Sequence, residues 1–202
     1  MCGIAGILGE AATEEAARRM CNVIRYRGPD DEGYFVRSGI ALGSVRLSII
    51  DLKTGHQPIH NEDSSLWIVY NGEIFNYREL RSELEGRHRF YTASDTEVIL
   101  HLYEDRGPGC LEKLNGMFAF AIWNEKTREL FLARDRVGVK PLYYCISEGS
   151  LLFASEIKAI LEFGIEKELD QKALIDYLTL SYVLGDKTFF KDVRQLPAGH
   201  FL

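Results

Sequence analysis

Apolar residues along the chain follow two kinds of spacing, which distinguish strands from helices. Short apolar runs bounded by Gly, Asn or charged residues predict β-strands at 3–8, 34–37, 40–50, 66–70, 117–123, 129–133, 142–146 and 151–154. Apolar residues three and four apart predict helices after Thr13, at 77–84, after Asp95 or Thr96, at 155–162 and at 171–180. The first helix is expected to end at 27–30, where Gly and Pro interrupt it. The polar stretch 53–65 predicts a long loop.

The connections between the strands indicate how they pair. Residues 124–127 and 147–150 are short polar turns between apolar runs, which is typical of β-hairpins and therefore of antiparallel neighbours. The helices occur in groups before and between the hairpins. The pattern therefore predicts an α+β fold in which antiparallel sheet carries helices on its faces, and it argues against a parallel βαβ fold.

Composition places the chain among ordinary globular proteins. Of the 202 residues, 46% are hydrophobic and 27% are charged, which argues against a disordered chain. The net charge of −6 offers no attraction to nucleic acid or to an anionic membrane surface. No apolar run approaches the ~20 residues needed to cross a bilayer. We therefore expect neither nucleic acid nor membrane as a partner.

Three of the four cysteines have the character of core residues. They are widely spaced, form no C-x-x-C pair, and follow no recognisable signal peptide. We therefore expect reduced thiols and a cytoplasmic location. Cys21, Cys110 and Cys145 are predicted to be small buried hydrophobic residues.

Cys2 differs from the other cysteines because it follows Met1 directly. A small residue at position 2 permits removal of Met1, which would place a thiol and a free α-amine on one residue. The amine has a reference pKa of ~7.7–8.0 and the thiol ~8.5, so the amine is able to take and return the proton. This is the terminal-amine form of nucleophile activation. The alternative interpretation is a cysteine packed on a strand.

Asn71-Gly72-Glu73 follows a predicted strand. Gly lets the backbone turn and expose its N–H, and the Asn amide beside it supplies a second donor for a developing oxyanion. Glu73 adds a carboxylate nearby. The commoner meaning of Asn-Gly is a plain turn, and both interpretations remain open on the residues alone.

Arg46 and Asp95 are charged residues in unusual settings. Arg46 lies within a mostly apolar stretch, where a buried charge needs a partner. Arg binds a carboxylate through two parallel bonds, so it suits either a ligand or a structural ion pair; a solvent-facing position is the third option. Asp95 precedes a helix, and an N-cap is its simplest interpretation.

The sequence contains no recognisable metal site. His56 and His60 are four residues apart, but Pro58 between them argues against the helix that a metal-binding pair would need. No H-E-x-x-H, G-x-S-x-G or phosphate-binding glycine-rich loop occurs. We therefore expect no metal and no cofactor in this chain.

Nine segments spread over the chain together resemble one family. They are 1–4 (MCGI), 25–30 (RYRGPD), 46–51 (RLSIID), 71–77 (NGEIFNY), 94–97 (SDTE), 116–121 (GMFAFA), 134–144 (RDRVGVKPLYY), 154–158 (ASEIK) and 196–199 (LPAG). In this order they resemble the N-terminal glutaminase domain of class II glutamine amidotransferases, specifically that of asparagine synthetase (glutamine-hydrolysing). One departure is Tyr26, which stands where many relatives have His; it alters no expected catalytic role.

The resemblance implies an N-terminal-nucleophile hydrolase fold, a four-layer αββα sandwich of two antiparallel sheets. It implies free glutamine as substrate, attacked at its side-chain amide by Cys2, with the α-amine of Cys2 as proton carrier. Asn71 and Gly72 would form the oxyanion hole. The γ-glutamyl thioester would be released by water as glutamate, with ammonia as the other product.

The resemblance also implies how the substrate is held. Arg46 would bind the α-carboxylate, and Asp95, with a contribution from Glu73, would bind the α-amino group. A free amino acid carries both charges at its α-carbon, so such a pair would accept glutamine and reject a glutamine residue within a peptide.

The resemblance further implies a longer protein. The glutaminase domain is expected at 1–169, and 170–202 is expected to lead into an absent synthetase domain that converts aspartate to asparagine. No Ser-Gly-Gly-x-Asp-Ser pyrophosphate loop occurs, so ATP and Mg²⁺ are expected only for that domain. The apolar end, 196–202, predicts another strand and a chain that continues. A homodimer is a further expectation.

Several alternatives stay open at this point. The ammonia could serve another ATP-dependent amide-forming domain, or the chain could be an amidase acting on a different amide. A non-catalytic module on the same fold is a third alternative, although the presence of the Cys, Arg, Asn and Asp argues against it. The segment 134–144 is either a contact with the partner domain or a tight connection with structural charges.

Overall fold

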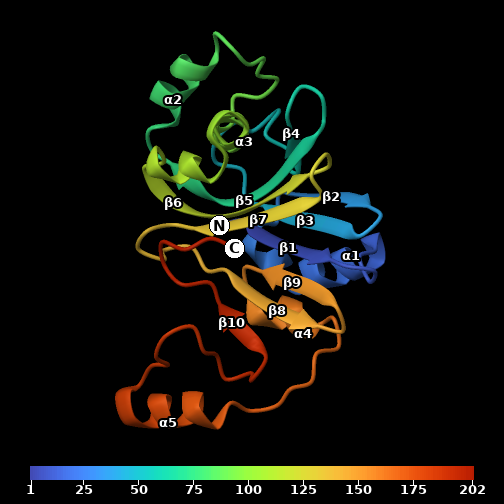
Figure 1. Ribbon diagram of the computed structural model, residues 1–202, viewed down its shortest axis with the longest axis vertical. Helices are drawn as coiled ribbons and strands as arrows, with labels where there is room; N and C mark the ends of the chain where they lie inside the picture. The colour runs from blue at the N-terminus through green and yellow to red at the C-terminus, as the bar shows by residue number, and fades with distance from the viewer.

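The strands form two antiparallel sheets (Figure 1) in the computed structural model, which describes residues 1–202. The six-stranded sheet has the order β10-β8-β9-β1-β3-β2 and the four-stranded sheet the order β4-β5-β6-β7. The first consists of β1 (Gly3–Leu8), β2 (Asp31–Arg37), β3 (Ile40–Arg46), β8 (Tyr143–Ser147), β9 (Ser150–Ala154) and β10 (Val193–Gln195). The second consists of β4 (Ile59–His60), β5 (Leu66–Ile74), β6 (Gly116–Asn124) and β7 (Glu129–Arg134).

Helices cover the outer face of each sheet. α1 (Glu14–Asn22) and α4 (Ile157–Leu161) pack on the six-stranded sheet, and α2 (Tyr77–Leu84) and α3 (Asp95–Arg106) pack on the four-stranded sheet. Short 3₁₀ helices occupy Arg25–Arg27 and Gly107–Glu112. α5 (Gln171–Leu180) lies apart from both sheets, at the lower end of Figure 1.

Three hydrophobic clusters hold these layers together. One joins α2 and α3 to the four-stranded sheet, a second joins α1 and α4 to the six-stranded sheet, and a third fills the space between the two sheets. Apolar burial at each of the three boundaries stabilises the stack. The four-layer αββα sandwich expected from the sequence is therefore confirmed.

Strand alternation directs three polar side chains into the space between the sheets. Residues two apart on a strand point to the same face. Ile4, Leu42 and Val69 belong to the cluster between the sheets. An even number of positions from each of them, at or beside the end of the same strand, lies a polar residue that points to the same face. These polar residues are Cys2, Arg46 and Asn71, respectively. One end of the inter-sheet space is therefore polar.

Several predicted elements match the structure closely. The strand at 3–8 and the helices at 77–84 and 171–180 have the predicted bounds. Thr13 is the N-cap of α1, and its side chain accepts a hydrogen bond from the backbone N–H of Ala16 at 3.2 Å. The hairpins β6–β7 and β8–β9 form at the predicted turns. Cys21, Cys110 and Cys145 are buried, as predicted.

Three predicted strand ends are wrong. The strand expected at 34–37 begins at Asp31, because residues 31–33 already pair with β3. The strand expected at 40–50 ends at Arg46, because Arg46 is the last residue that pairs with β2. The strand expected to end at Tyr70 continues to Ile74 instead. Asn71 and Gly72 do not form a turn, because they pair with Ala119 and Phe118 of β6.

Three helix predictions are also corrected. Ser94, not Asp95 or Thr96, is the N-cap of α3, and its hydroxyl accepts from the N–H of Thr96 at 3.2 Å. α1 ends at Asn22, before the 3₁₀ turn, and the helix expected at 155–162 is the shorter α4. The predicted loop 53–65 contains the two-residue strand β4, which pairs with β5.

The last residues extend the sheets. β10 pairs with β8, and Leu202 exchanges two backbone hydrogen bonds with Leu132 of β7, at 2.8 and 2.9 Å. The strand expected at 196–202 does not form: only an isolated antiparallel bridge joins Phe201 to Ala133, because the turn at 197–200 interrupts the extended backbone. No helix combines the length and the apolar character required to traverse a lipid bilayer.

Candidate functional site

A pocket opens at the polar end of the inter-sheet space. Its lining includes all six residues singled out from the sequence, namely Cys2, Arg46, Asn71, Gly72, Glu73 and Asp95. They come from β3, from β5, from the first residue of α3 and from the segment that leads into β1. Residues 93 positions apart in the sequence thus line one cavity.

Cys2 lies at the entry to β1 with its backbone clamped. The carbonyl of Cys2 accepts a 3.0 Å hydrogen bond from Arg27 Nε, and Arg27 is itself held by an ion pair with Glu156 at 2.6 Å. Cys2 Sγ is 3.6 Å from the carbonyl oxygen of Leu47. Burial raises the pKa of the Cys2 thiol above its usual range. The thiol is therefore neutral at neutral pH and needs a base before it acts as a nucleophile.

Asn71 presents a free donor to the pocket. The residue is 1% exposed, and its Nδ2 group has no hydrogen-bond partner in the protein. Leaving a buried donor unpaired costs about 1–3 kcal/mol. An orphaned N–H donor beside a thiol is the arrangement expected where a negative oxygen develops during a reaction.

Gly72 is required by the close approach of β6. A Cβ atom at this position would lie 2.3 Å from the carbonyl oxygen of Met117, so no larger residue fits without moving the strand. The small residue keeps β5 and β6 in register beside the Asn71 amide. The backbone at 71–72 is therefore fixed by sheet pairing rather than by a turn.

Arg46 is buried without a counter-charge. It is 5% exposed, and Nη2 donates to the carbonyl oxygens of Ile50 and Asp51 at 2.8 and 2.7 Å. Gly55 lets the loop close on the guanidinium, because a Cβ there would lie 2.5 Å from Nη2. No protein carboxylate forms an ion pair with Arg46, so neither the structural ion pair nor the solvent-facing position applies. The positive charge faces the pocket.

Asp95 is the corresponding buried anion. Its Oδ2 accepts hydrogen bonds from the Tyr70 hydroxyl at 2.9 Å and from the N–H of Ile74 at 3.0 Å. Burial raises the pKa of the Asp95 carboxyl, and no cationic side chain pairs with it. Glu73, which is half-buried, adds a second carboxylate to the lining.

Lys140 and Tyr70 are pocket residues that sequence reasoning missed. Lys140 is 5% exposed and has no carboxylate partner; its Nζ donates to the sulfur of Met1 at 3.4 Å. The available signal was its place in the segment 134–144, a lysine among apolar residues. Tyr70 precedes Asn71 on β5, so alternation turns it toward α3 and Asp95.

The remaining charges of segment 134–144 are structural. Arg134 donates to the carbonyl oxygens of Lys140, Gly138 and Leu196 at 2.6–2.7 Å. The Asp135 carboxylate accepts from four backbone N–H groups, which lowers its pKa. These contacts are those of a tight connection between β7 and β8.

The pocket as a whole combines three chemical functions. It contains a nucleophile precursor, an unpartnered amide donor, and buried opposite charges that the protein does not neutralise. An amino-acid zwitterion supplies the complementary charges, and nothing in the lining forms a metal cluster. The geometry thus suits attack on a carbonyl group of a small amino acid.

Two features of this chain define its class. The first is a pair of antiparallel sheets between layers of helices, and the second is a cysteine at the start of a central strand that lines the pocket. The chain belongs to the class II glutamine amidotransferases, since the family model described as the glutamine amidotransferase domain matches residues 1–202.

Two curated relatives are similar to this chain over its whole length. The chain is 42% identical over 214 residues to asparagine synthetase (glutamine-hydrolyzing) 2 of Bacillus subtilis (strain 168), covering 100% of this chain and 28% of that protein. It is 38% identical over 217 residues to the amidase chyE of Penicillium rubens, covering 100% of this chain and 32% of that protein. The chain thus spans about a third of the length of these curated relatives.

A solved structure shares the fold. The glutamine phosphoribosylpyrophosphate (PRPP) amidotransferase from B. subtilis, in complex with ADP and GMP, superposes with a TM-score of 0.69 at 26% identity. The match covers 81% of this chain and 44% of that chain. The chain is therefore a glutaminase-type domain related to asparagine synthetases.

Proposed function

We propose that this domain hydrolyses the side-chain amide of free glutamine to glutamate and ammonia through a thioester on Cys2. The observation that carries the proposal is the pair of opposite charges beside Cys2. Arg46 and Asp95 are both buried, line one pocket and have no counter-ion in the protein. Free glutamine supplies both missing charges, whereas a glutamine residue within a peptide supplies neither.

The proposed binding mode follows from these charges. Arg46 binds the α-carboxylate through the guanidinium nitrogens that the Ile50 and Asp51 carbonyls leave free. Asp95, with Glu73, binds the α-ammonium group. Tyr70 and the N–H of Ile74 hold Asp95 in its ionised position. The side-chain amide of glutamine then reaches toward Cys2 and Asn71.

The proposed chemistry begins when Met1 is removed. The freed α-amine of Cys2 takes the thiol proton, and Sγ forms a bond to the amide carbon of glutamine. The carbonyl oxygen becomes an oxyanion that accepts hydrogen bonds from Asn71 Nδ2 and the N–H of Gly72. The α-ammonium returns its proton to the leaving nitrogen as the C–N bond breaks and ammonia departs. Water then attacks the thioester, which releases glutamate and restores the thiol.

The proposed acceptor of the ammonia is a synthetase domain that makes asparagine from aspartate with ATP. Support comes from the names of relatives such as the B. subtilis asparagine synthetase. We propose 1–169 as the glutaminase domain and 170–202 as the segment leading toward the acceptor. Ile175 and Leu178 of α5 are 63% and 75% exposed, which fits a helix that meets a further surface. Another amide-forming acceptor is the alternative.

An amidase acting on another amide is the second candidate function. The name of the Penicillium relative favours it. It predicts turnover of amides that lack a free α-amine and α-carboxylate. The unpaired Arg46 and Asp95 favour glutamine as the substrate. An amide without an α-amine and an α-carboxylate would leave both buried charges without a partner, which is costly.

Intact mass after incubation with a glutamine-shaped diazoketone tests the proposal. We expect a chain without Met1 that carries one adduct, and no adduct in the Cys2→Ala variant. A processed chain that stays unlabelled, together with no glutamate released from glutamine, contradicts the proposal and favours a non-catalytic module. Rapid turnover of an N-acylated glutamine with slow turnover of free glutamine favours the amidase.

A further inference from the structure

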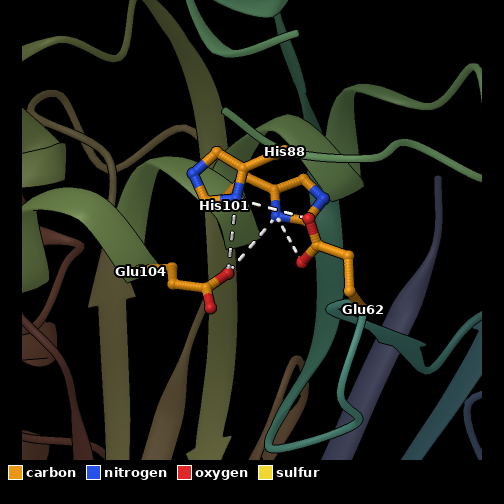
Figure 2. A group of neighbouring side chains, drawn as sticks. All are labelled: Glu62, His88, His101 and Glu104. Carbon is orange, nitrogen blue, oxygen red and sulfur yellow. Dashed lines mark hydrogen bonds and ion pairs between the residues drawn. The ribbon is translucent and has the colours of Figure 1, made fainter. Parts of the chain in front are cut away.

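A second cluster of chemically active side chains lies on the helix layer of the four-stranded sheet. Glu62, His88, His101 and Glu104 place one ligand atom each within 4.8 Å of one another (Figure 2). His101 and Glu104 lie one turn apart on α3. Glu62 comes from the loop after β4, and His88 from the loop between α2 and α3. Three separate segments therefore converge on one point.

Four distances between imidazole nitrogens and carboxylate oxygens lie close to the separations of ligands around a metal ion, and one of them, from His101 Nδ1 to Glu104 Oε2, is also a long hydrogen bond. His88 Nδ1 is 3.5 Å from a Glu62 oxygen and 3.7 Å from Glu104 Oε2. His101 Nδ1 is 3.7 Å from Glu62 Oε2 and 3.4 Å from Glu104 Oε2. Ordinary N–H···O bonds measure about 2.7–3.2 Å. Four ligands at about 2.0–2.1 Å from a tetrahedral zinc ion are separated by roughly 3.3–3.4 Å.

The far nitrogen of each imidazole faces a carboxylate. His88 Nε2 lies 3.0 Å from Asp105 Oδ1, and His101 Nε2 lies 3.5 Å from Glu97 Oε1. For His88, a proton on Nε2 directed at Asp105 leaves Nδ1 with a lone pair aimed into the cluster, whereas His101 Nε2 is buried near Glu97 without a hydrogen-bond partner. Histidines that bind metals almost always have such an outer partner, which fixes the ring and its tautomer.

The two glutamates are oriented in the same way. Glu62 Oε1 accepts a hydrogen bond from the N–H of Arg89 at 2.8 Å. Glu104 Oε1 accepts one from Asn61 Nδ2 at 3.0 Å. Glu104 therefore directs Oε2 toward the imidazoles, and Glu62 faces His88 with Oε1 and His101 with Oε2, as Figure 2 shows.

Burial around the cluster leaves one open side. The side chain of His101 is fully buried and that of His88 is 10% exposed, whereas Glu62 and Glu104 are 33% and 34% exposed. An ion has a route in past the carboxylates, while the histidine side is closed by packing. The two imidazole rings stack at 4.5 Å with 27° between their planes, so binding requires a modest turn of the rings toward a common centre.

We propose that Glu62, His88, His101 and Glu104 form a structural site for a divalent transition-metal ion of the zinc type. Two imidazoles and two carboxylates suit zinc, whereas Mg²⁺ and Ca²⁺ prefer oxygen ligands alone. Four protein ligands leave no open position, which is the character of a structural site. The site lies outside the glutamine pocket and does not depend on the proposed hydrolysis.

The site would stabilise the segment that carries Asp95. Glu97, whose Oε1 lies 3.5 Å from His101 Nε2, accepts hydrogen bonds from the N–H groups of Tyr91 and Thr92, at 2.9 and 2.7 Å. These residues immediately precede Ser94 and Asp95. An ion that fixes His101 and His88 thus ties both ends of the α2–α3 loop to α3.

A zinc titration of the 202-residue chain tests the site. The chain is treated with EDTA, desalted and titrated with Zn²⁺ alone against a chromophoric chelator. A Cys2→Ala background keeps the pocket thiol from contributing, and the other cysteines are buried. We expect one zinc per chain and, at saturation, a Tm increase of at least about 5 °C.

Variants distinguish this site from incidental binding. Glu104→Gln and His88→Gln should each weaken Zn²⁺ binding at least about tenfold, and Asp105→Asn should weaken it about 10–100-fold through its histidine. The matched controls Glu83→Gln and His200→Gln alter exposed residues outside the cluster and should bind as the parent does. Because Glu104 is a partly exposed ligand, its loss should not prevent folding, which circular dichroism checks.

Two results would overturn the proposal. One is a parent chain that takes up less than one zinc per chain at micromolar Zn²⁺ with no change in Tm. The other is a folded Glu104→Gln variant that binds zinc as tightly as the parent. Either outcome means that the four side chains contact one another without holding a metal ion.

Discussion

The hydroxyl of Tyr70 donates a 2.9 Å hydrogen bond to Oδ2 of Asp95, on the face of β5 opposite to Asn71. Adjacent residues of a strand point to opposite faces, so one dipeptide serves both ends of the proposed substrate. Tyr70 positions the carboxylate proposed to bind the α-ammonium group, and Asn71 presents the donor proposed for the oxyanion. Strand β5 therefore sets the distance between the group that binds the α-ammonium and the group that stabilises the oxyanion.

Tyr70→Phe removes the hydroxyl donor from Asp95. Hydrogen bonds to a charged group contribute about 1.5–3 kcal/mol, so we expect KM for glutamine to rise roughly 10–100-fold with a smaller change in kcat. Steady-state glutamate release measures both parameters. Tyr103→Phe is the matched control, because Tyr103 also packs in the helix layer but its hydroxyl makes no hydrogen bond. An equal rise of KM in the two variants would exclude a specific role for Tyr70.

Asn71→Ala removes the orphaned Nδ2 donor. If this group stabilises the oxyanion, kcat should fall by about 10²–10³ while KM changes little. Folding stability should hardly change, because the donor has no partner to lose in the free protein. Single-turnover kinetics and a thermal melt measured on the same sample separate these effects. A clear loss of Tm with unchanged kcat would show that Asn71 is structural.

Arg46→Ala should act on binding. Removing the partner of a buried carboxylate costs about 2–5 kcal/mol, so KM for glutamine should rise by at least tenfold. Because Arg46 also holds the Ile50 and Asp51 carbonyls, a second substrate is needed as a control. 4-Aminobutanamide is glutamine without its carboxylate. The parent should have a much higher kcat/KM for glutamine than for this analogue, whereas the two values should be similar in Arg46→Ala. If Arg46→Ala keeps the preference for glutamine, Arg46 does not bind the carboxylate.

Asp95→Asn should stabilise the fold while it impairs glutamine binding. The pKa of Asp95 is raised in the folded state, mainly by burial, so ionising it at neutral pH disfavours folding. Asparagine keeps an oxygen for Tyr70 and Ile74 but carries no charge. We expect a higher Tm than the parent at neutral pH.

The stability difference between Asp95→Asn and the parent should depend on pH. The unfolded chain releases the Asp95 proton near pH 3.9, whereas the folded protein retains it to higher pH. The stability gained by Asp95→Asn should therefore shrink as pH falls through the folded-state pKa, and disappear below about pH 4. Chemical denaturation at several pH values measures the difference. A gap that widens toward low pH would contradict the raised pKa.

Local sequence predicted most of the strands because hairpin partners lie close together in the chain. It failed where a distant partner decides the outcome. Asn71 and Gly72 have the composition of a turn, but β6 supplies pairing partners more than forty residues away, and the strand continues. Ser94 and Asp95 are equally good caps in sequence. The Asp95 carboxylate accepts hydrogen bonds from Tyr70 and Ile74, so Ser94 is the residue that caps α3.

The candidate site could be named from sequence motifs, but its electrostatics could not. That Arg46 has no carboxylate partner, and that Asn71 Nδ2 has none at all, depends on packing between the two sheets. Lys140 was missed because its burial follows from the connection between β7 and β8. The Glu62–His88–His101–Glu104 cluster was missed because only His101 and Glu104 are neighbours at helical spacing.

The central position of β1 has a consequence for how the domain is made. β1 lies between β3 and β9, and the N–H of Ile4 donates to the hydroxyl of Ser155, 151 residues further along the chain. At synthesis rates of about 5–20 residues per second, that partner leaves the ribosome roughly 8 to 30 s after the first residues. The cysteine at the head of β1 is thus made well before the segment that completes its surroundings.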